Sequence, residues 1–245
     1  MIFLNYSFVI TLFAGLSTLI GIIPVFIKIK NINKFIVSSL SFASGVMFSI
    51  STFDLLIESL KSFNKEYNSF IGTILFLFFF IIGFIFSKYI NNRIDSDNEL
   101  YKVGISSMLG IILHNIPEGI LTFITYSVNQ KLGITLGIAI ALHNIPEGIT
   151  IAVPIYYSTK SKLKVFIYSL ISALAEPLGA VLSYIFLKNI IDNMMIGIML
   201  SIVSGIMIYI SIFELVKEAK KYNEDKLLNL FFIIGFLFMF FILQI

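Results

Sequence analysis

Two copies of one hexapeptide, HNIPEG, stand at residues 114–119 and 143–148, and together they contain both histidines of the chain. In a helix, a histidine and the glutamate four residues later project from one face, and the asparagine lies three residues before that glutamate. Each copy therefore predicts an imidazole, an amide and a carboxylate along one stripe. The proline of each copy lacks a backbone N–H and clashes with the carbonyl one turn earlier, which weakens the helix beside the stripe.

A third carboxylate, Glu176, stands beside Pro177 in a further apolar stretch. A charge at the centre of a membrane costs roughly 2.5–3.5 kcal/mol on insertion scales, so three such glutamates are expensive unless something offsets them. A divalent cation does this, because its charge compensates the burial and the mutual repulsion of carboxylates. Hydrogen bonding between helices is the alternative role, but it requires neither histidine nor duplicated spacing. The residues therefore predict a cation site of two imidazoles and up to three carboxylates.

These residues lie in a chain that is too apolar for a soluble protein. Of its 245 residues, 58% are hydrophobic and 13% are charged, and its mean hydropathy is +0.98, whereas a soluble domain carries roughly 25% charged residues. Eight stretches of about 20 apolar residues are each long enough to cross a hydrocarbon core about 30 Å thick as a helix. The sequence predicts an all-α polytopic membrane protein in which residues 1–245 form one transmembrane domain. The predicted spans lie near 6–27, 35–60, 69–90, 101–128, 131–157, 164–187, 193–217 and 227–244.

The positive residues in the loops between the spans indicate the topology. Thirteen of the 17 lysine and arginine residues fall in loops 1–2, 3–4, 5–6 and 7–8, and four fall in the other loops. Positive residues in short loops are retained on the cytoplasmic side, so we expect a cell-membrane protein with both termini outside the cytoplasm. The first apolar stretch has no positive segment before it and no small-residue cleavage site, so we expect it to be a span rather than a removable signal peptide. The absence of cysteine excludes thiolate metal sites, and the scattered lysines disfavour nucleic-acid binding.

Residues 44–59 align without gaps with residues 204–219, and Asp54 stands opposite Glu214. By the predicted topology these are spans 2 and 7, which run in opposite directions. An inverted repeat of the first and last three spans, with two central helices left over, is typical of a secondary transporter. Shared composition bias is the alternative explanation of the match. For Asp54 and Glu214, a role along an ion pathway and a purely hydrogen-bonding role both stay open.

The paired HNIPEG motifs, the eight spans with both termini outside and the 3+2+3 arrangement resemble the ZIP family, the Zrt-, Irt-like divalent metal transporters, and in particular its bacterial broad-range zinc and iron branch. The resemblance implies a transporter without a cofactor that brings zinc, and also iron(II), manganese and cobalt, into the cytoplasm. It further implies a binuclear centre on spans 4, 5 and 6. The implied ligands of the first metal are His143, Glu118, Glu147 and His114, and those of the second are Asn115, Asn144 and Glu176, with Glu118 and Glu147 bridging.

Two other functions could use the same residues. Histidine and glutamate also hold hydrolytic zinc or di-iron centres, so a membrane-embedded metal-dependent enzyme is the main alternative. Such an enzyme needs an open metal position and a substrate cleft, and the sequence contains no further nucleophile motif. A metal-stabilised membrane scaffold without transport is the other reading. Besides divalent ions, the expected partner is the lipid bilayer, and a homodimer stays open.

Overall fold

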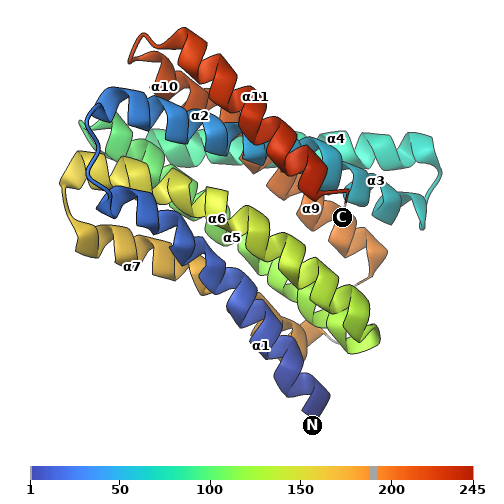
Figure 1. The fold of residues 1–245 in the computed structure, drawn as a ribbon. Coiled ribbons are helices and arrows are strands. Elements are labelled where there is room, and N and C mark those ends of the chain that lie inside the picture. The colour runs from blue at the N-terminus through green and yellow to red at the C-terminus, as the bar shows by residue number, and fades with distance from the viewer. Residues whose placement is uncertain (1, 188–191, 245) are drawn as a thin grey trace.

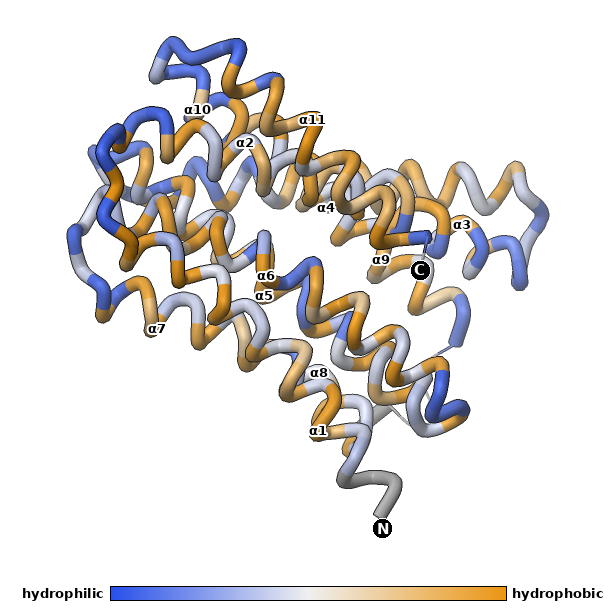
Figure 2. Tube along the Cα trace, in the orientation of Figure 1, coloured by the Kyte–Doolittle hydropathy of each residue, from blue (hydrophilic) through white to orange (hydrophobic). Residues whose placement is uncertain are grey.

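The computed structural model describes residues 2–187 and 192–244, and in this part of the chain every regular element is helical. Eight of the helical segments are long and apolar enough to cross a membrane, which confirms the predicted all-α, eight-span fold. Figure 2 shows hydrophilic residues gathered at the ends of the helices, with mostly hydrophobic residues between them. The eight segments are Tyr6–Phe26, Ile32–Asn64, Ser69–Arg93, Glu99–Val128, Gln130–Thr159, Lys162–Ile185, Asn193–Lys220 and Asp225–Ile242.

Several of these spans are not uniform α-helices. The first consists of α1 (Ile2–Leu16) followed by a 3₁₀ helix (Ser17–Phe26). Spans 2, 6 and 7 are also interrupted, and their helical parts are α2 (Ile32–Ile50) and α3 (Leu56–Asn64), α7 (Lys162–Ala173) and α8 (Ala175–Leu182), and α9 (Asn193–Ile208) and α10 (Lys217–Lys220). The others are continuous: α4 (Ser69–Arg93), α5 (Glu99–Val128), α6 (Gln130–Thr159) and α11 (Asp225–Ile242).

Polar side chains fix where most spans begin. Residues Asn31, Asn68, Asn98 and Asn129 each accept a hydrogen bond from the backbone N–H three residues later. Ser161 and Asp192 cap the sixth and seventh spans in the same way. These caps satisfy backbone donors that a helix leaves free at its first turn. These six apolar stretches therefore start at a defined residue, although hydropathy alone gives only an approximate boundary.

The helices form two groups (Figure 1). Helices α2, α4, α9 and α11 pack together on one side, and α1, α5, α6, α7 and α8 pack together on the other. Within the first group, glycines let the helices approach closely: a Cβ added at Gly45 of α2 would overlap the backbone oxygen of Phe232 in α11, and one added at Gly205 of α9 would overlap that of Phe80 in α4. Gly45 and Gly205 are equivalent positions of the sequence repeat, so spans 2 and 8 meet as spans 7 and 3 do.

Serine hydrogen bonds between spans 2 and 7 show the same reciprocity. The Ser44 hydroxyl donates to the backbone oxygen of Ser211 at 3.0 Å, and the Ser204 hydroxyl donates to that of Ser51 at 3.1 Å. Positions 44 and 204 are equivalent in the repeat, as are 51 and 211. A π-helical segment also starts at or just before each equivalent point, at Ser51–Leu55 and at Tyr209–Val216. The two segments run in opposite directions (Figure 1), so the sequence match reflects an inverted structural repeat.

Candidate metal centre

The two HNIPEG motifs lie midway along α5 and α6, which pack against each other. Each motif has its histidine, asparagine and glutamate at the same spacing along its helix. The packing of α5 against α6 therefore brings the two sets of side chains to one place inside the bundle. His114, Glu118, His143 and Glu147 are all buried there. The i, i+4 spacing thus produces the common face that the sequence predicts, on both helices.

Both imidazoles contact the same carboxylate oxygen. Nε2 of His143 lies 2.8 Å from Oε1 of Glu118, and Nε2 of His114 lies 3.0 Å from that oxygen. Nε2 of His114 is also 3.5 Å from Oε1 of Glu147. One ligand atom each from His114, Glu118 and His143 lies within 4.8 Å of the others. Nitrogen and oxygen donors at this separation can surround one cation with bonds of about 2 Å.

The two asparagines are held by their amide nitrogens. Nδ2 of Asn115 donates to the backbone oxygen of Ser172 at 3.1 Å, and Nδ2 of Asn144 donates to that of Ala14 at 2.9 Å and to Oε2 of Glu176 at 3.0 Å. These bonds fix which way each amide faces. Both Oδ1 atoms are buried and receive no hydrogen bond within the described part of the chain. The anchored amides therefore present free oxygens.

Three glutamates add further free oxygens. Oε2 of Glu118, Oε2 of Glu147 and Oε1 of Glu176 are buried and, among residues 2–187 and 192–244, have no hydrogen-bond donor. Buried polar atoms are nearly always paired in native proteins. A set of buried, unpaired oxygens next to two imidazoles is what a bound cation would satisfy.

The last glycine of each motif brings a neighbouring span against the centre. A Cβ added at Gly119 would overlap the backbone oxygen of Glu176, and one added at Gly148 would overlap that of Thr18. Glu176 in span 6 and Thr18 in span 1 thus occupy equivalent places, and Thr18 has a buried hydroxyl without a hydrogen-bond partner in the described chain. Sequence reasoning missed Thr18 because the first span contains no motif that marks it.

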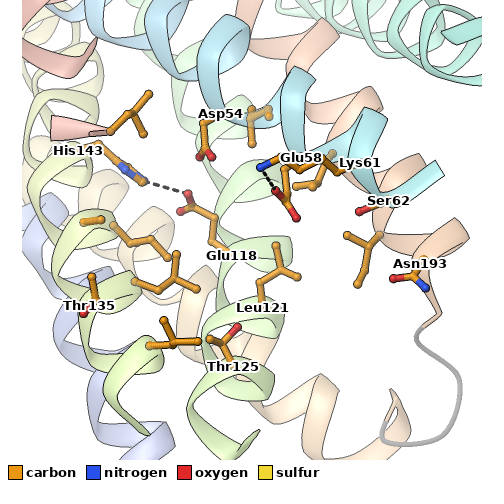
Figure 3. Close-up of a pocket in the computed structure, with 18 of the residues that line it drawn as sticks. Asp54, Glu58, Lys61, Ser62, Glu118, Leu121, Thr125, Thr135, His143 and Asn193 are labelled. Carbon is orange, nitrogen blue, oxygen red and sulfur yellow. Dashed lines mark hydrogen bonds and ion pairs between the residues drawn. The ribbon is translucent and has the colours of Figure 1, made fainter. Parts of the chain in front are cut away.

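A cavity of about 810 Å³ reaches this centre from one end of the bundle (Figure 3). Glu118 and His143 form its inner end, and the exposed Lys61 and Lys65 lie along its wall at the end of the second span. Asp54 also lines it, and in Figure 3 its carboxylate faces the space beside Glu118 and His143. The cavity gives an ion a path from the end of the molecule to two of the buried donors.

The two acidic residues of the inverted repeat differ in their surroundings. Asp54 is partly exposed in the cavity, whereas Glu214 is buried and accepts a 2.7 Å hydrogen bond from the Ser106 hydroxyl. Of the residues that the sequence singles out, the structure brings together His114, Glu118, His143 and Glu147 and joins Asn144 to Glu176. Asn115 is buried next to His114 in the chain and is bonded to Ser172, and Asp54 lines the cavity together with Glu118 and His143. Glu214 lies apart from the cavity.

Comparisons with known proteins identify the family of the chain. The family described as ZIP Zinc transporter matches residues 90–243. The chain is 38% identical to a protein named Zinc transporter ZupT from Oceanobacillus iheyensis, over 89% of each chain, and 38% identical to one of the same name from Chlorobium luteolum, over 90% of each. A third of that name, from Streptococcus mutans, is 36% identical over 95% of this chain and 94% of its own. These relatives are named transporters and not enzymes. The chain therefore belongs to the ZIP family of membrane metal transporters.

Proposed function

We propose that this protein carries zinc, and with it iron(II), manganese and cobalt, into the cytoplasm through a binuclear centre on spans 4, 5 and 6, with no resident cofactor. The observation that supports this most directly is the group of buried and unpaired nitrogen and oxygen atoms at the inner end of the cavity. Divalent ions of this class bind imidazole and carboxylate together. A metal-stabilised scaffold would have no need of an open path to the same atoms.

The first ion in this proposal binds His143, Glu118, Glu147 and His114. The contacts of His114 and His143 with Glu118, at 3.0 and 2.8 Å, support it, because they place two imidazole nitrogens and a carboxylate oxygen close enough to bind one cation. Imidazole favours zinc among the available divalent ions. We expect this to be the tighter zinc site.

The second ion binds Asn115, Asn144 and Glu176, and Glu118 and Glu147 bridge the two ions. The backbone anchors of both asparagines support this assignment, since such outer hydrogen bonds orient ligands toward a metal. An all-oxygen set is harder than the first site and suits manganese and iron(II). Magnesium should compete poorly because it gives up its water molecules reluctantly.

The whole chain acts in this proposal as one transport domain of the cell membrane, with both termini and the cavity on the outer side. The charge distribution supports it. The cavity reaches the loop end that carries Lys61 and Lys65, whereas 13 of the 17 positive residues are in loops that face the other way. The structure would then represent a state that is open to the outside.

Zinc uptake into sealed vesicles by the purified protein is the deciding experiment, run beside elemental analysis of the same preparation. We expect about two ions per chain and uptake that iron(II), manganese and cobalt inhibit. Asp97→Asn is the control, because Asp97 is exposed and far from the centre in sequence. Metal binding without uptake would favour a scaffold, and one ion per chain would contradict the binuclear centre.

A further inference from the structure

The inverted repeat extends to the two central helices, and this allows both ends of the bundle to be compared residue by residue. A residue of span 2 corresponds to one 160 positions later in span 7, and a residue of span 4 corresponds to one 29 positions later in span 5. The contacts follow this rule at the centre: Asn115 bonds the backbone of Ser172 as Asn144 bonds that of Ala14. We call the end with the cavity the cavity side and the opposite end the closed side.

On the closed side a carboxyl group is bonded to a hydroxyl. Oγ of Ser106 in α5 donates to Oε1 of Glu214 at 2.7 Å, and both residues are buried. The counterparts of Glu214 and Ser106 on the cavity side are Asp54 and Thr135. A carboxylate and a hydroxyl therefore stand at equivalent positions at both ends.

On the cavity side the same pair is apart. Asp54 and Thr135 both line the cavity and lie on different walls of it in Figure 3. The Thr135 hydroxyl donates instead to the backbone oxygen of Lys131 at 3.1 Å. The pair that is joined where the bundle is closed is thus separated where the bundle is open.

A second contact also distinguishes the two ends, through a difference in sequence. On the closed side, Lys221 is 2.6 Å from Glu218 and 3.8 Å from Glu99 at the start of α5, so it links span 7 to span 4. On the cavity side, the equivalent Lys61 is 3.3 Å from Glu58 and lines the cavity. Position 128, which is 29 residues after Glu99, precedes α6 and is occupied by Val128, so no carboxylate stands there for Lys61 to contact. The two ends therefore differ in whether a central helix is fastened to the neighbouring repeat.

We propose that Ser106 with Glu214 and Thr135 with Asp54 are two alternating latches of the transport cycle. When an end is closed, its hydroxyl binds its carboxyl group and compensates the burial of that polar side chain. When the end opens, the carboxylate is released and faces the ion path, as Asp54 does beside Glu118 and His143. Asp54 and Glu214 are then carboxylates that meet the ion on entry and exit. Ser106 and Thr135 are positioning residues that set which end is open.

The inference rests on the proposed transport function, but its test reads conformation and not transport. The chain has no cysteine, so one introduced thiol reports one position. Leu136→Cys lines the cavity, and Ser107→Cys, its counterpart, lies at a fully buried position on the closed side. Reaction of purified protein with a water-soluble maleimide measures how often each position is open.

Removing either hydroxyl should change the reaction rates of the two introduced cysteines in opposite directions. Ser106→Ala loosens the closed side, so we expect Ser107→Cys to react about fivefold faster and Leu136→Cys to react more slowly, given the typical net worth of one hydrogen bond. Thr135→Val weakens closure of the cavity side, so we expect Ser107→Cys to react about fivefold more slowly. Thr135→Ser keeps the hydroxyl and should match the unmodified background.

Two matched controls separate a latch from a general loss of packing. Ser169→Ala removes a buried hydroxyl that has no hydrogen-bond partner in the described chain, and Thr125→Val removes a hydroxyl from the lining of the cavity. Neither should change reporter rates by more than about twofold. The proposal would be overturned if Ser106→Ala and Thr135→Val changed the reaction rate of Ser107→Cys in the same direction, or if neither changed it. Zinc binding and uptake by the same unmodified protein report separately whether the transport function itself fails.

Discussion

Replacement of Glu118 by glutamine is the sharpest test of the metal centre. Oε1 of Glu118 is within 3.0 Å of both imidazoles, and Oε2 is buried without a donor. Glutamine keeps the shape of the side chain but removes its charge and leaves only one oxygen. A ligand that bridges two ions would thus lose its function at both.

The size of the effect follows from ligand energetics. Losing even an outer partner of a metal ligand typically weakens metal binding 10- to 100-fold, so loss of a bridging carboxylate should weaken zinc binding at least about 100-fold. At a zinc concentration of 100 times the dissociation constant, the unmodified protein gains about 2.7 kcal/mol of stability. At the same concentration the variant should gain only about 0.4 kcal/mol.

The metal-free protein should respond in the opposite sense. Without an ion, Glu118 is a buried acidic group. Glutamine removes the cost of burying its charge, and the amide oxygen that remains can still accept a hydrogen bond from an imidazole. Thermal unfolding of purified Glu118→Gln with and without zinc separates the two effects. We expect an unchanged or raised midpoint without zinc and almost no further rise when zinc is added, whereas Asp97→Asn should behave as the unmodified protein in both conditions.

A zinc-induced rise in Glu118→Gln equal to that of the unmodified protein would refute the assignment of Glu118 as a ligand. A large fall in the metal-free midpoint would instead indicate that Glu118 mainly holds the bundle together through the two histidines. Direct zinc titration against a chelator gives the change in affinity independently of unfolding.

Three further predictions concern the second site, the pH dependence and the topology. Asn144→Ala should reduce bound metal from about two ions per chain toward one, because its Oδ1 is lost, and two ions in the folded variant would count against that ligand; elemental analysis decides. Zinc affinity should fall as the pH drops below about 6, since free imidazole has a pKa of about 6.5 and must be neutral to bind metal; equal affinity at pH 5 and 7.5 in a zinc titration would contradict histidine ligation. In intact cells, an impermeant thiol reagent should label Asn129→Cys but not Ser161→Cys, and labelling of the latter from outside would reverse the proposed orientation.

Much of the fold and the centre could be predicted because the relevant signals are local. Hydropathy marks each span, and the spacing of His114 and Glu118 fixes a common helix face whatever the tertiary structure is. Glu176 could be recognised because a glutamate in an apolar stretch is costly. The repeat of residues 44–59 could be read because its two copies still share identical residues in register.

Other features depend on packing and have no local signal. The proposed role of Ser106 and Thr135 follows from what each one faces, a buried carboxyl group and the cavity, and a serine or threonine in an apolar span is common. The difference between Asp54 in a cavity and Glu214 in a closed part of the bundle arises from the packing of the helices, which equivalent sequence positions do not encode. The 3₁₀ segment Ser17–Phe26 likewise lies in a stretch whose hydropathy is that of any span.

The reciprocal bonds among Ser44, Ser51, Ser204 and Ser211 are those that two identical chains, inserted in opposite orientations, would make with each other. In such a pair every substitution would appear twice, once in each copy, and any specialised residue would be duplicated. A single chain containing both copies is free of that constraint. Thr18 and Glu176 illustrate the difference, since they occupy equivalent places but only one offers a carboxylate. A chain that contains both copies can thus keep the symmetry in its framework while one side alone carries the additional carboxylate of Glu176.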